Sequence, residues 1–83
     1  MSAKEILENV EQGFSKEIEK HLERYFTFHN GDVIPPGLYD RILKEVERVV
    51  FEVTLRHVNG NQLKAAKILG ISRNTLRKKT IQD

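Results

Sequence analysis

The 83-residue sequence contains no cysteine and only two prolines. The lack of cysteine excludes disulfide bonds, thiolate metal sites and cysteine nucleophiles, and it fits a reducing cytosol. Long apolar runs are also missing, since no stretch approaches the length of a membrane span and Met1 to Glu5 lack the layout of a signal peptide. We therefore expect a soluble, cytoplasmic protein with no membrane association.

Motifs for catalysis are missing as well. His21, His29 and His57 have no metal-ligand spacing with one another or with a suitable pair of carboxylates. Serine, histidine and aspartate are present, but without a Gly-x-Ser-x-Gly elbow or a phosphate-binding glycine loop. The sequence therefore predicts no enzymatic activity, no catalytic residue, no metal and no cofactor.

Charge is divided unevenly along the chain, although the net charge is only +2. Residues 1–30 contain four basic and six acidic side chains, residues 31–58 contain four and five, and residues 59–83 contain six and one. The basic excess therefore lies in the last third. This asymmetry is typical of a nucleic-acid contact surface, because phosphate neutralisation needs lysine and arginine on one face. A solvated basic tail is the alternative.

Apolar periodicity predicts an all-α domain over residues 1–83 with four helices and no strand. The expected helices span about 3–29, 38–57, 61–69 and 73–81. The first two have apolar residues at intervals of three and four, as in amphipathic helices. Asn30 to Asp32 is a stop signal, and the Pro35–Pro36 pair prevents helix until it is passed.

The first two expected helices have more apolar surface than the two short helices behind them can cover. The economical solution is a homodimer in which both long helices of each chain build a bundle core. The residues expected in this interface are Val10, Phe14, Ile18, Leu22, Ile42, Val46, Val49 and Val53. The alternative is a monomer whose N-terminal helix folds back over the second helix.

The segment NQLKAAKILGISRNTLRKK, residues 61–79, has the pattern of a helix-turn-helix. Asn61 and Ser72 are suited to cap the two short helices. Gly70 permits the left-handed backbone of a sharp turn, and the small Ala66 allows two helices to cross closely. Leu76 and Ile71 are expected to point into the core.

The other side of the last helix then faces outward. Arg73, Asn74, Arg77 and Lys78 lie there, with 73 beside 77 and 74 beside 78 on successive turns. Arginine can bridge the two acceptors of guanine, asparagine suits adenine, and lysine suits phosphate or guanine. Polar groups near helix starts can hold phosphate oxygens. These patterns favour a DNA contact by Asn61, Ser72, Arg73, Asn74, Thr75, Arg77 and Lys78, whereas Lys79 is expected to be solvated.

The stretch GNQLKAAKILGISRNTLRKK resembles the Fis-type helix-turn-helix of NtrC-type activators, which work with sigma-54 RNA polymerase, and of the nucleoid protein Fis. The preceding EVERVVFEVTLRHVNGNQ is similar to the helix that leads into this motif in the NtrC group. The resemblance implies a four-helix domain that dimerises through its first two helices and binds a two-fold-related DNA site.

The resemblance also ranks the site residues. It implies that Arg73 and Lys78 are the leading base-contact candidates, with Ser72 or Asn74 beside them. It further implies that Asn61, Thr75 and Arg77 lie near phosphates. Thr80 stands where the family pattern has an apolar residue, so the length of the last helix is left open.

The preferred functional hypothesis is a homodimeric, sequence-specific binder of double-stranded DNA. It would anchor a bacterial sigma-54-dependent activator, a response regulator of the NtrC family, at pseudo-palindromic upstream sites. Regulatory and ATPase domains would then belong to a longer parent protein. A free-standing Fis-like nucleoid protein that bends DNA with weak sequence preference is the first alternative. A helical interaction module with a solvated basic end is the second.

Overall fold

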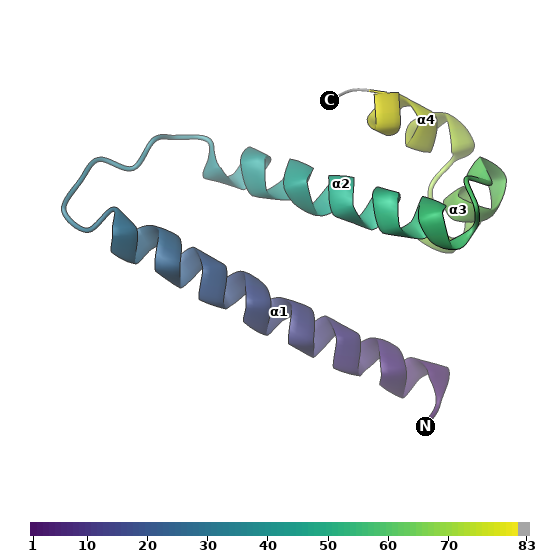
Figure 1. The fold of residues 1–83 in the computed structure, drawn as a ribbon, viewed down its shortest axis with the longest axis horizontal. Coiled ribbons are helices and arrows are strands. Elements are labelled where there is room, and N and C mark those ends of the chain that lie inside the picture. The colour runs from purple at the N-terminus through teal and green to yellow at the C-terminus, as the bar shows by residue number, and fades with distance from the viewer. Residues whose placement is uncertain (82–83) are drawn as a thin grey trace. The chain divides into compact units, whose positions relative to one another are not determined.

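The computed structural model of the protein describes the backbone of residues 1–81 and the side chains of residues 1–80. Over these residues the chain forms four α-helices and no strand (Figure 1). The helices are α1 (Ala3–Phe28), α2 (Leu38–His57), α3 (Gln62–Leu69) and α4 (Arg73–Ile81). The all-α, four-helix fold expected from the sequence is therefore confirmed.

The chain divides into two compact units, residues 1–35 and 36–83. The first unit contains α1, which begins where the Ser2 hydroxyl accepts a hydrogen bond of 3.2 Å from the backbone N–H of Glu5. This cap satisfies one of the free amides of the first turn. No residue of α1 is buried. Because an amphipathic helix is stabilised by packing of its apolar face, α1 needs a partner surface for stability.

The second unit contains α2, α3 and α4, and α2 is its longest element. Gly37, which comes directly after the two prolines, precedes the helix and has a left-handed backbone with φ of 96°. At the other end, Gly60 donates its N–H to the carbonyl of Leu55 at 2.8 Å, which closes the last turn of the helix. This turn directs the chain into α3, which begins after only four intervening residues (Figure 1).

A small apolar core joins the three helices of the second unit. Phe51 from α2, Ala65 and Ala66 from α3, and Leu76 from α4 are its buried members. Half-buried side chains pack around this group, namely Leu55, Val58, Leu69 and Ile71. The two alanines have side chains small enough to let neighbouring helices approach, and Leu76 is the largest fully buried side chain.

The turn between α3 and α4 has the conformation that the sequence predicts. Gly70 has φ of 72°, in the left-handed region where a Cβ would be strained. The N–H of Ile71 donates to the carbonyl of Ala66 at 3.1 Å, and the Ile71 side chain packs against the core. The helix that follows runs through Thr80 to Ile81. Thr80 therefore does not end it, and its hydroxyl donates to the helix's own carbonyls, at 2.9 Å to Leu76 and 3.1 Å to Arg77.

Truncation of Leu76 tests the importance of this core. We expect Leu76→Ala to lower the free energy of unfolding by about 2 to 5 kcal/mol, because the change leaves a cavity in a core with few buried members. Urea denaturation at a fixed protein concentration measures the effect. Leu63→Ala is the matched control, since Leu63 is 59% exposed on α3 and should change stability by less than about 0.5 kcal/mol. Equal urea midpoints for the two variants would contradict the assignment of Leu76 as the central core residue.

Candidate nucleic-acid interface

The interface begins with two capped helix starts. The side-chain oxygen of Asn61 accepts a hydrogen bond from the N–H of Lys64 at 3.1 Å, which caps α3. The Ser72 hydroxyl accepts one from the N–H of Thr75 at 3.1 Å, at the start of α4. Both capping assignments made from the sequence are therefore confirmed, and each contributes on the order of 1 kcal/mol to helix stability.

Ser72 and Thr75 also contact each other through their hydroxyl groups. The two oxygens are 2.8 Å apart, and either can be the donor. Since each hydroxyl has one proton and one proton is used between the two groups, one O–H remains for an external acceptor. A phosphate oxygen at the start of α4 is an acceptor of the right kind. The cap and a phosphate contact are thus chemically compatible at this position.

The exposed side of α4 is polar and basic. Leu76 is fully buried, while Arg73, Asn74, Arg77 and Lys78 are all exposed. Because residues three and four apart are neighbours on a helix, these four side chains share the surface that Leu76 leaves outward. The structure therefore brings together the base-contact candidates on one element, while Thr75 is half-buried at its start.

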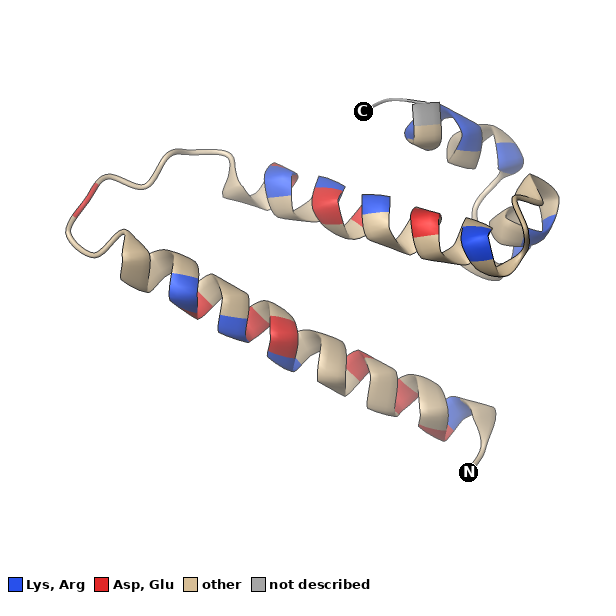
Figure 2. Cartoon of the chain, in the orientation of Figure 1, with Lys and Arg blue, Asp and Glu red and all other residues tan. Residues whose placement is uncertain are grey.

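Charge on the two short helices has one sign. Residues 59–81 contain six lysines and arginines and no aspartate or glutamate, and Figure 2 shows α3 and α4 with blue bands only. Both red and blue bands occur along α1 and along α2 (Figure 2). The helix-turn-helix is therefore the part of the chain whose field attracts a polyanion.

One contact in this region was missed by sequence reasoning. The ammonium group of Lys79 lies 3.1 Å from both carboxylate oxygens of Glu47, so α4 is bonded to α2. Lys79 is exposed, as expected, but it is also bonded to Glu47, which the sequence did not predict. The two residues are 32 positions apart, and no helical spacing links them. Only the packing of α4 against α2, which Leu76 and Phe51 determine, brings them together.

The residues predicted for a dimer interface line the two long helices. In the single chain Val10, Phe14, Ile42, Val49 and Val53 are exposed, and Ile18, Leu22 and Val46 are half-buried. On α2 the buried Phe51 faces the helix-turn-helix, so the exposed valines lie on another side of the same helix. These apolar surfaces are free to pack, and the dimer itself stays a prediction.

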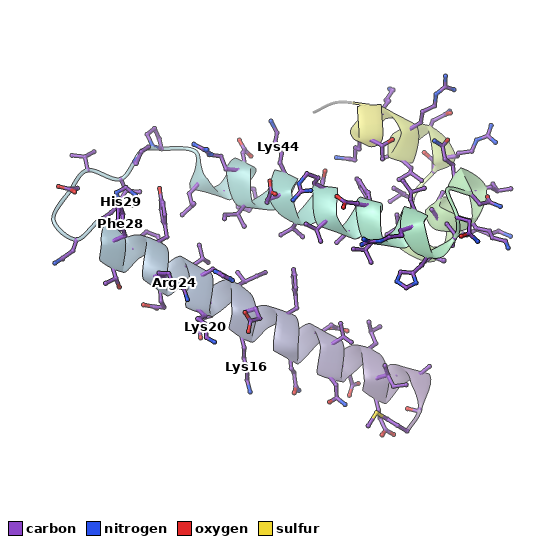
Figure 3. All side chains as sticks on the ribbon, in the orientation of Figure 1. Lys16, Lys20, Arg24, Phe28, His29 and Lys44 are labelled. Carbon is purple, nitrogen blue, oxygen red and sulfur yellow. The ribbon has the colours of Figure 1, made fainter. Side chains whose placement is uncertain are left out.

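Most basic side chains of the two long helices form ion pairs within their own helix or have acidic residues between them in the sequence. On α2 the Arg48 guanidinium contacts Glu45 at 2.6 Å and Glu52 at 3.0 Å. The hydrogen bond and charge of Glu45, followed by the charge of Glu52, raise the pKa of Arg48 above its ordinary value. On α1 the cations Lys16, Lys20 and Arg24 recur every four residues (Figure 3), but carboxylates separate them in the sequence. Neither group matches the unbroken positive charge of α3 and α4.

Within residues 1–81 no group of three or more histidine, aspartate or glutamate side chains could hold a metal ion. No helix in that part of the chain is both long and apolar enough to cross a membrane.

Comparison with known proteins gives the family. Residues 42–80 match the bacterial regulatory protein family Fis. The chain is 46% identical over 65 residues to a putative Fis-like DNA-binding protein of Neisseria meningitidis, an alignment that covers 78% of this chain and 81% of the relative. It is 42% identical over 62 residues to the DNA-binding protein Fis of Buchnera aphidicola, which covers 75% of this chain and 63% of the relative.

A second kind of relative is much longer. The DNA-binding transcriptional regulator NtrC of Azospirillum brasilense is 46% identical over 78 residues, which are 94% of this chain but only 16% of that protein. The chain thus spans about one sixth of the length of this relative. The family match includes α3 and α4 up to Thr80, the helix-turn-helix that packs around Leu76. The chain belongs to the Fis family of bacterial regulatory proteins.

Proposed function

We propose that the protein binds double-stranded DNA sequence-specifically as a homodimer, with α4 of each chain in the major groove. The observation that supports this most directly is the position of Leu76. Its complete burial leaves Arg73, Asn74, Arg77 and Lys78 exposed on the outer side of a capped helix. Arginine and asparagine have the donor patterns that distinguish bases in the major groove. The names of relatives from Neisseria and Buchnera, which describe DNA-binding proteins, agree with this proposal.

The homodimer is proposed from the apolar surface of α1 and α2. Phe14 and Val49 are 49% and 45% exposed in the single chain, as are several neighbours of similar size. Exposed apolar side chains repeated along a helix in this way are costly in water and mark an interaction site on each of the two helices. A second copy would offer the same surface, so a two-fold bundle would cover both. Two α4 helices about one turn of DNA apart, near 34 Å, would then read a pseudo-palindrome.

We further propose that this unit anchors a longer sigma-54-dependent activator at upstream sites. The alignment with the Azospirillum regulator NtrC covers 94% of this chain, including most of α1, whereas that with the Neisseria Fis-like protein covers 78%. Regulatory and ATPase functions would belong to other domains of the parent protein. A free-standing Fis-like protein that bends DNA is the second candidate, since the Neisseria relative is a protein of similar length.

Selection of bound duplexes from random DNA tests the function. We expect a consensus with two-fold symmetry and half-site centres about 10 base pairs apart. Titration of the best duplex against scrambled competitor at several salt concentrations then gives the specificity ratio. A large ratio supports the activator, while tight, salt-sensitive binding with little preference favours the DNA-bending protein. Absence of binding would refute both and leave an interaction module.

Replacement of Arg73 tests the base contact. We expect Arg73→Ala to weaken binding to the selected duplex by about 1 to 3 kcal/mol and to relax preference at one base position per half-site. Repeated selection with the variant measures both effects. Lys16→Ala removes the same charge from α1 and should leave the consensus unchanged. Uniform weakening of Arg73→Ala on all sequences would instead make Arg73 a phosphate contact.

Introduction of a charge on α2 tests the dimer. We expect Val49→Glu to give a monomer in sedimentation and to abolish tight binding, because the carboxylate would have to be buried in the bundle. Stability should fall as well, since the long helices lose their partner surface. Val33→Glu is the matched control, because Val33 is 92% exposed between α1 and α2. A soluble Val49→Glu monomer that still binds at full strength would contradict the proposed assembly.

A further inference from the structure

The contact between Glu47 and Lys79 differs from the other polar contacts of the chain. Over the described residues it is the one side-chain hydrogen-bonded contact that joins two helices, since the others lie within eight positions of each other. Both carboxylate oxygens lie 3.1 Å from the ammonium nitrogen. The side chains are 35% and 42% exposed, so water screens the pair less than it screens the exposed pairs of Arg48.

The contact lies near the end of α4, where it can fix the position of the last turn of this helix against α2. The start of α4 is held by the turn at Gly70 and the cap at Ser72, and its middle is held by Leu76. Lys79 lies one turn beyond Leu76, about 4.5 Å further along the axis at 1.5 Å per residue. Thr80 does not link α4 to another helix through its hydroxyl, which bonds to carbonyls of α4 itself. The polar link between α2 and the last turn of α4 is therefore the pair of Glu47 and Lys79.

We propose that Glu47 and Lys79 are positioning residues that set the angle between the recognition helix and the dimerisation helix. The inference relies on the proposed function, in which α2 builds the dimer and α4 enters the groove. Rotation of α4 about Leu76 would move Arg77 and Lys78, which flank Lys79 in the sequence, relative to the bases. The angle between α2 and α4 also determines the separation of the two recognition helices. The pair thereby tunes which half-site spacing the dimer accepts.

Opposite charge changes separate positioning from simple electrostatics. Glu47→Gln makes the protein more positive and should strengthen DNA binding if only net charge matters, whereas Lys79→Gln should weaken it. The positioning role predicts that both variants lose affinity for the optimally spaced duplex, by about three- to tenfold per dimer. Both should also respond less than the wild type when one base pair is inserted or deleted between the half-sites.

Matched controls exist for both changes. Glu45→Gln removes the same charge from α2, but among the described residues Glu45 forms its side-chain hydrogen bonds with Arg48 of its own helix. Lys16→Gln removes the same charge from α1 as Lys79→Gln removes from α4. The charge exchange Glu47→Lys with Lys79→Glu keeps the net charge and rebuilds the pair in reverse. We expect the exchange to restore the sharp spacing dependence that the single variants lose.

Binding is measured with duplexes that differ only in half-site spacing, and circular dichroism verifies the fold of each variant. If Glu47→Gln and Glu45→Gln have the same affinity and spacing profile, the positioning role is wrong. Wild-type protein that binds no DNA would instead refute the proposed function. In that case hydrogen exchange of the backbone amides still tests whether the pair holds the end of α4. The N–H groups of Lys79 and Thr80 should exchange faster in Glu47→Gln than in Glu45→Gln. Equal exchange rates in the two variants would overturn the inference.

Discussion

The burial of one leucine between two alanines and a phenylalanine is the constraint on which the second unit depends. Leu76 and Ala65 are completely buried, and Ala66 and Phe51 nearly so. With so few buried side chains, the apolar free energy available to hold α2, α3 and α4 together is small, at about 1.5 to 3 kcal/mol for each large one. Each contact that adds to this core therefore has a large relative effect. Caps, the Gly70 turn and the ion pair of Lys79 act around it.

The same constraint determines the chemistry of the surface. Once Leu76 is fixed inward, the helical period leaves no freedom in the direction of Arg77 and Lys78, one and two positions later. The basic excess of the last third thus lies on elements whose orientation is set by packing and by capping. In a solvated basic tail the charged side chains would have no fixed directions relative to one another. Rigid placement of arginine and asparagine is what direct base readout needs.

Much of this could be predicted from the sequence because it is local. Asn61, Gly70 and Ser72 act on backbone groups within four residues, so their roles can be recognised from short spacings. The contact of Lys79 with Glu47 could not be predicted from the sequence, since it depends on how α4 crosses α2. The partners of the exposed apolar side chains of α1 and α2 could not be predicted either. Those partners would come from outside the chain, and a single chain shows only that Phe14 and Val49 are exposed.

The two faces of α2 would let one helix serve both the proposed assembly and the placement of α4. Glu47, Phe51 and Leu55 recur every four residues and face the helix-turn-helix. Val49 and Val53 follow Glu47 by two and six positions, which turns them about 160° and 120° away at 100° per residue. A dimer formed through the valines would therefore leave the contacts of Phe51 intact. The distance between the two recognition helices would then be set by α2 of each chain and by the contacts of α2 with α4. The half-site spacing would therefore depend on few other contacts. Changes of Arg73, Asn74, Arg77 or Lys78 could alter which bases are read without altering that spacing, because the polar contact of α4 with α2 is made by Lys79 instead.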